Sequence, residues 1–169
     1  MANYIKRGGT IVAIDPDIKK NGIAVIDRES RSMELYHLPF PETLELVRRL
    51  HEKRPKPFAV FVEAGWMNRG NWHITESRNG KFSPSAYAAA VGQGTGEGHA
   101  VSKLLLACFE YEEIPSRPIR PLRKCWKGPD RKITHDELMK ELVTYHIKHS
   151  IKRTNPETRD AALLALVNL

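Results

Sequence analysis

The sequence is poor in cysteine and has no long apolar run, and each absence narrows the class of protein. Its two cysteines, Cys108 and Cys125, lie far apart and form no Cys-x-x-Cys pair, so we expect reduced thiols, with Cys108 packed in the core. No apolar stretch is long enough to span a bilayer, and the first six residues lack the apolar core of a secretory signal. We therefore expect a cytoplasmic protein with no membrane contact.

The sequence has fewer acidic residues than basic ones. The chain has 27 Lys and Arg against 20 Asp and Glu, a formal net charge of +7 and a pI near 9.5. Such a balance favours a polyanionic partner such as nucleic acid, although many soluble proteins share it. A length of 169 residues, without internal repeats, low-complexity tracts or linkers, predicts one domain over 1–169.

The acids that are present stand at the ends of predicted elements. Asp15 closes the first strand of a hairpin over 11–27, and Glu63 closes the apolar strand 58–62. Glu157 and Asp160 lie three residues apart near the start of a helix over 155–169, where Pro156 suits the first turn. Any one of these acids is more simply explained as a turn or cap residue, so their joint order carries the argument.

That order resembles the ribonuclease H fold, and specifically the RuvC-like Holliday junction resolvases. The resemblance rests on IVAIDPDIKKNGIAVID, FAVFVEAGW and PETRDAALLAL and spans nearly the whole chain. It implies an α/β, ribonuclease H-like fold with a mixed central β-sheet flanked by helices. Asp15, Glu63 and Asp160 match the family's first-strand aspartate, fourth-strand glutamate and final aspartate.

Two positions depart from the family pattern. Glu157 stands where the family usually has Asp or His, although a glutamate can still supply an oxygen ligand. Asp17 stands where many relatives have Gly, and it is either a turn-forming residue, which we favour, or an outer acid near the metals.

Four clustered carboxylates repel one another, and a divalent cation relieves that repulsion. Oxygen ligands without His or Cys favour Mg²⁺, or Mn²⁺, over Zn²⁺. Two ions about 4 Å apart can hold a scissile phosphate between them, so the predicted reaction is phosphodiester hydrolysis. The predicted catalytic and metal ligands are Asp15, Glu63, Glu157 and Asp160.

Two segments interleave aromatic and basic residues, as nucleic-acid-binding surfaces do. The first follows Glu63 and contains Trp66, Arg69, Arg78 and Lys81. In the resolvases an aromatic residue three positions beyond this glutamate enters the junction, and Trp66 matches it; packing on the core is an equal alternative. For Trp72 and His73 we favour a structural role.

The second segment, 117–127, resembles the Pro-x-x-x-Trp-Lys region of small phage and mobile-element RuvC-like proteins. Its predicted DNA-binding residues are Arg120, Arg123, Lys124 and Trp126, with a solvated charge run as the alternative. We place Lys127 near the scissile phosphate as a catalytic cation.

The coarse pattern predicts strands at 10–15, 22–27, 31–38, 58–63 and 116–120, with helices at 41–53, up to 111, 134–149 and 155–169. The glycine run 92–98 lacks the preceding strand and Lys-Ser/Thr of a P-loop. In the resolvases the helix in this region forms much of the dimer interface, which implies a homodimer. Leu104, Leu105 and Phe109 are candidates for core or subunit contact.

The sequence therefore predicts a metal-dependent, structure-selective DNA endonuclease that resolves four-way junctions. Three alternatives stay open at this level: a nuclease of the same fold acting on RNA or an RNA/DNA hybrid, a nucleotide-binding lobe like those of the actin-like ATPases, and a non-catalytic nucleic-acid-binding protein. The chain is short for the second, and retention of all four acids opposes the third.

Overall fold

The computed structural model describes residues 8–54, 56–68 and 84–169. The strands are β1 Thr10–Asp15, β2 Asn21–Asp27, β3 Ser32–Leu38, β4 Phe58–Glu63, β5 Ser116–Ile119 and β6 Lys148–His149. The helices are α1 Phe40–Lys53, α2 Pro84–Tyr111, α3 His135–Thr144 and α4 Pro156–Val167, with short 3-10 turns at Gly65–Met67 and Pro129–Arg131.

The strands form one mixed sheet in the order β5-β4-β1-β2-β3-β6. β1, β2 and β3 form an antiparallel meander, whereas β4 runs parallel to β1, β5 parallel to β4, and β6 parallel to β3. Both edges are short, because β5 has four residues, one of them Pro118, and β6 has two. The predicted mixed α/β sheet flanked by helices is confirmed.

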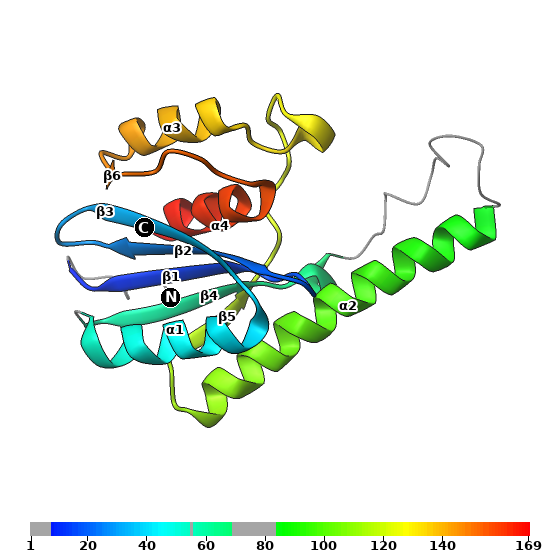
Figure 1. The fold of residues 1–169 in the computed structure, drawn as a ribbon, viewed down its shortest axis with the longest axis horizontal. Coiled ribbons are helices and arrows are strands. Elements are labelled where there is room, and N and C mark those ends of the chain that lie inside the picture. The colour runs from blue at the N-terminus through cyan, green and yellow to red at the C-terminus, as the bar shows by residue number, and fades with distance from the viewer. Residues whose placement is uncertain (1–7, 55, 69–83) are drawn as a thin grey trace.

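Helices cover both faces of this sheet, so the central strands are apolar on both sides (Figure 1). Ile11 and Ala13 of β1 face a cluster that includes residues of α3 and α4, while Val12 and Ile14 face one that includes residues of α1 and α2. This two-sided burial explains why β1 and β2 read as continuous apolar runs.

The helix predicted over 134–149 is wrong in its last turn. α3 ends at Thr144, and His146 takes a positive φ of 53°, which a continuing helix does not allow. The Ile147 amide then donates to the Leu142 carbonyl, and the Lys148 amide donates to the Arg31 carbonyl. Pairing with β3 thereby replaces helical hydrogen bonds and adds a sixth strand that sequence periodicity did not predict.

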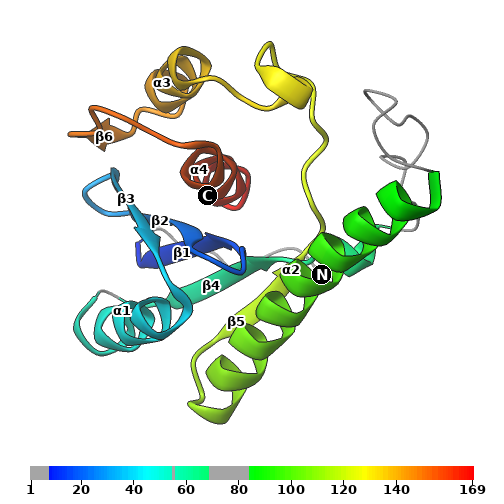
Figure 2. The same ribbon diagram turned by 45° about the vertical axis from the view of Figure 1, so that its right-hand side comes forward.

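α2 begins well outside the body of the molecule (Figure 2). Among its described side chains, the first to be buried is that of Val101, followed by Ser102, Leu105 and Phe109. Leu105 and Phe109 therefore belong to the core, whereas Leu104 is 56% exposed. In the described ranges, no helix combines the length and apolar character needed to cross a bilayer.

Candidate active site at the carboxyl ends of the central strands

Sheet pairing brings the first two acids together. β1 and β4 are parallel neighbours, with Ile14 opposite Val62, so Asp15 and Glu63 follow at the same edge of the sheet. Carboxyl ends of adjacent parallel strands always meet in this way. Two acids that are 48 positions apart in the sequence thus become neighbours.

The first turns of α4 carry the other two acids, Glu157 and Asp160. A capping box fixes it: the Asn155 side chain accepts from the Thr158 amide at 2.8 Å, and the Thr158 hydroxyl accepts from the Asn155 amide at 3.1 Å. This first turn lies directly on Gly22, the partner of Asp15 across the hairpin. A Cβ at Gly22 would lie 2.2 Å from the Glu157 carbonyl oxygen, so glycine is required for α4 to sit this close to β2.

The four carboxylates influence one another electrostatically. Burial is the main factor that raises the pKa of Asp15 well above its ordinary value, and the negative charges of Glu63 and Asp160 add to the increase. Glu157 contributes in the same direction. Burial, followed by the charge of Asp160, also raises the pKa of Glu63. Mutual repulsion of this kind favours binding of a cation.

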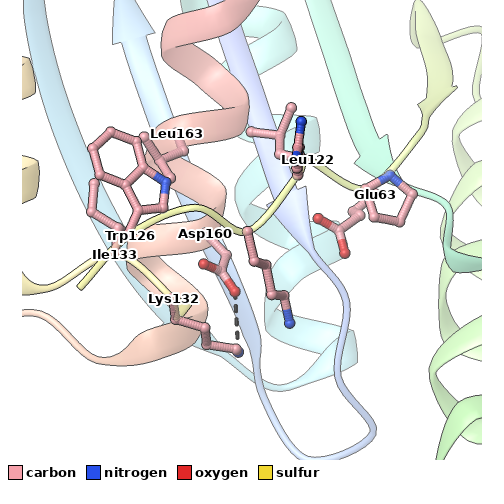
Figure 3. Close-up of a pocket in the computed structure, with 10 residues that line it drawn as sticks. Glu63, Leu122, Trp126, Lys132, Ile133, Asp160 and Leu163 are labelled. Atoms are coloured by element: carbon pink, nitrogen blue, oxygen red, sulfur yellow. Dashed lines mark ion pairs between the residues drawn. The ribbon is translucent and has the colours of Figure 1, made fainter. Parts of the chain in front are cut away.

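A lysine that the sequence analysis did not select already lies among these acids. Lys132 Nζ is 3.1 Å from Asp160 Oδ2, and the two side chains are only 29% and 19% exposed (Figure 3). Partial burial acts to lower the pKa of Lys132, but the charge and hydrogen bond of Asp160 outweigh it, so the pKa is raised. Asp15 and Glu157 add to that increase.

The backbone around Lys132 is held in place. Arg159 Nε donates to the Ile133 carbonyl at 2.7 Å, which ties this segment to α4 one residue before Asp160. The Lys132 amide donates to the Pro129 carbonyl, and its carbonyl accepts from Gly128. The Thr134-to-Glu137 capping box of α3 begins two residues later, and this sequence signal predicts the start of the helix but not where the Lys132 side chain lies.

A small cavity lies between this segment and the acids. Its volume is about 30 Å³, enough for water or an ion. Glu63 of β4, Asp160 of α4 and Lys132 of the loop before α3 line it (Figure 3). The other lining residues are Pro121, Leu122, Arg123, Lys124, Trp126, Ile133 and Leu163.

The acids suit Mg²⁺ in kind, because all are carboxylates, and burial together with their mutual charges raises the pKa values of Asp15 and Glu63. As they stand, however, no three His, Cys, Asp or Glu side chains within the described ranges are close enough together to hold a metal ion. Asp160 is turned toward Lys132 (Figure 3). Metal binding at all four acids therefore requires side-chain rearrangement, and Lys132 already occupies Asp160 Oδ2.

The predicted basic segment divides into two parts. Arg123 and Lys124 line the cavity, and the charge of Lys124 opposes the rise in the pKa of Glu63. Lys127 is not among the described residues that line the cavity; its backbone amide donates to the Glu137 carboxylate of α3. Trp126 both lines the cavity and packs on the core, and Arg120 is exposed.

Trp66 lies on the 3-10 turn directly after Glu63. Its ring meets His99 of α2 edge-on, with centroids 5.9 Å apart, and Lys103 Nζ lies 5.5 Å from its centroid. Trp66 is not among the described residues that pack on either core cluster. Its partly exposed ring therefore rests on α2, next to the site.

The remaining predictions fall in two groups. Asp17 forms the hairpin turn, since its Oδ1 accepts from the Lys19 amide at 2.8 Å, as we favoured. The other residues lie outside the described ranges, and these are Arg69, Trp72, His73, Arg78 and Lys81.

Comparison with known proteins shows the fold class, which is ribonuclease H-like. A solved structure of Thermus thermophilus RuvC in complex with Holliday junction substrate matches with a TM-score of 0.51 and 16% identity, over 93% of this chain and 90% of that one. A second Thermus thermophilus RuvC structure matches with a TM-score of 0.44, 16% identity and 93% and 91% coverage. No family model matches the sequence, and no curated protein does. At this identity the likeness establishes the shared fold.

Proposed function

We propose that this protein is a metal-dependent endonuclease that cuts branched DNA, with the four-way junction as its substrate. The observation that carries the proposal is the convergence of Asp15, Glu63, Glu157 and Asp160 from β1, β4 and α4 at one edge of a ribonuclease H-like sheet. The net charge of +7 and the junction bound to the structural neighbour support a DNA substrate.

The four carboxylates are the groups that would hold two Mg²⁺ or Mn²⁺ ions. Ions bound there would supply Lewis-acid stabilisation of the charge that develops on the phosphate during hydrolysis. Lys124, which faces Glu63, would add a positive charge at the same phosphate. We assign this role to Lys124 in place of Lys127, because Lys127 is not among the described residues that line the cavity.

The surroundings of the site fit a branched substrate. Trp66 presents a partly exposed ring beside the acids, where it can stack on bases that are unpaired at a junction centre. Arg120 and Arg123 are exposed for contact with phosphates. A four-way junction is cut symmetrically by two sites, so we propose a homodimer. The Trp126-Lys127 motif favours a phage or mobile-element member of the group.

The test is a substrate panel. Labelled four-way junction, flap, duplex and RNA/DNA hybrid are incubated with the protein in MgCl₂, MnCl₂ or EDTA, beside Asp160→Asn. We expect paired symmetric nicks in the junction, dependent on a divalent ion and lost in the variant. Cleavage of the hybrid instead would replace the DNA assignment with an RNA one. Undiminished cleavage in EDTA would refute the metal-dependent mechanism.

A further inference from the structure

Lys132 is a cation that interacts electrostatically with the acids of the candidate site. It forms an ion pair with Asp160, and its positive charge opposes the rise in the pKa of both Asp15 and Glu63. Glu157 in turn acts on the pKa of Lys132. One ammonium thus interacts with all four carboxylates, as a divalent ion bound to them would.

This position has a consequence for metal loading. With Asp160 in the ion pair, no three acids of the described chain are arranged to hold an ion. A divalent ion that binds Asp160 through Oδ2 must displace Lys132, and one bound through Oδ1 would lie close to the ammonium and be repelled by it. The inference rests on the proposed function, because it concerns the same four ligands.

We propose that Lys132 serves as the built-in counter-cation of the metal-free site and competes with Mg²⁺ for Asp160, so that it sets the Mg²⁺ concentration at which the site loads. The backbone contacts of Lys132 with Pro129 and Gly128, and of Arg159 with Ile133, keep the competing ammonium within reach of the acids. A divalent ion compensates more of the negative charge than an ammonium does, so it displaces Lys132 once its concentration is high enough.

Isothermal titration with MnCl₂ tests the competition directly, on the wild type, Lys132→Gln and Lys140→Gln. Lys140 is an exposed lysine on α3 outside the cavity and provides the matched control. We expect Lys132→Gln to bind Mn²⁺ about ten-fold more tightly. If the ion pair is formed in roughly nine wild-type molecules of ten, only about one in ten is ready to bind the ion, and the apparent affinity falls by that factor. Lys140→Gln should bind as the wild type does, and equal affinities for all three proteins would overturn the proposal.

Thermal melting gives a second readout. Without Lys132 the repelling acids lose their counter-cation, so Lys132→Gln should melt at a lower temperature than the wild type in EDTA and gain more from MnCl₂. Lys132→Arg keeps a cation and should restore the wild-type values. A Lys132→Gln protein that is as stable as the wild type in EDTA, with the same gain from MnCl₂, contradicts the proposal.

A third measurement needs no variant. Acetylation of the wild-type lysines, followed by mass spectrometry, should label Lys132 faster in MnCl₂ than in EDTA, relative to Lys140. An unchanged ratio in protein that has bound Mn²⁺ would overturn the competition while leaving the nuclease assignment intact. Failure of the wild type and Lys132→Gln alike to bind Mn²⁺ would instead refute the metal-dependent function and, with it, this proposal.

Discussion

Replacing Gly22 with alanine should misplace half of the acidic site without removing any acid. The new Cβ would lie 2.2 Å from the Glu157 carbonyl oxygen and 2.8 Å from the Thr158 amide nitrogen, whereas ordinary contact begins at 3.4 Å. These are backbone atoms, so the first turn of α4 must move away from β2 by about 1 Å. Overpacking of this kind costs about 1–3 kcal/mol of folding free energy.

The same movement carries Glu157 and Asp160 away from Asp15. A misplacement of about 1 Å costs roughly 100-fold in rate, so we expect junction cleavage by Gly22→Ala to fall by that factor while DNA binding is retained. Urea unfolding, single-turnover cleavage and binding titrations measure the three effects.

Gly94→Ala is the matched control, because the described structure has no atom within 4 Å of a Cβ there. Alanine in this helical position should leave cleavage unchanged and stabilise α2 by up to about 1 kcal/mol. Wild-type stability and turnover in Gly22→Ala would show that α4 does not depend on this close approach.

Three further outcomes follow from the described contacts. Because the folded protein raises the pKa of Asp15, its contribution to stability in EDTA is fully present below the unfolded pKa of about 4 and is lost as the pH rises through the folded value. Urea unfolding from pH 4 to 8 should therefore show a smaller decline for Asp15→Asn, and an unchanged decline would contradict the shift. Trp66→Ala should lose about 1–3 kcal/mol of junction binding, with duplex binding kept. A drop in melting temperature typical of a core truncation would instead assign Trp66 to the core. Arg120→Ala combined with Arg123→Ala should lower the salt dependence of DNA binding by about one unit of slope per lost phosphate contact, and an unaltered slope would make both residues merely solvated.

Five of the six strands of the described sheet and three of the helices could be predicted because their signals are local. Apolar runs bounded by Pro and Gly mark β1, β2 and β4, and the acids that end them are predictable for the same reason. The end of α3 could not be predicted, because pairing of Lys148 with β3 is a long-range contact.

The acids of the site were accessible to sequence reasoning, but its cation was not. Lys127 stands beside an aromatic residue in a basic run, whereas Lys132 acquires its position from the Arg159 bond to Ile133 and the turn at Pro129. The bond between Arg159 and Ile133 joins residues that are 26 positions apart, and the composition of neither segment predicts it.

The short sheet edges bear on how copies of this chain can associate. An exposed strand edge is a template on which another chain can add a strand, and long edges lead to fibrous aggregation. Here β5 contains Pro118, which has no amide hydrogen to donate, and β6 presents two residues, Lys148 and His149. Each of these two edge strands therefore presents at most four residues for pairing with another chain. We therefore expect the subunits of the proposed dimer to meet through side chains on helix faces, without extension of β5 or β6 into an intermolecular sheet.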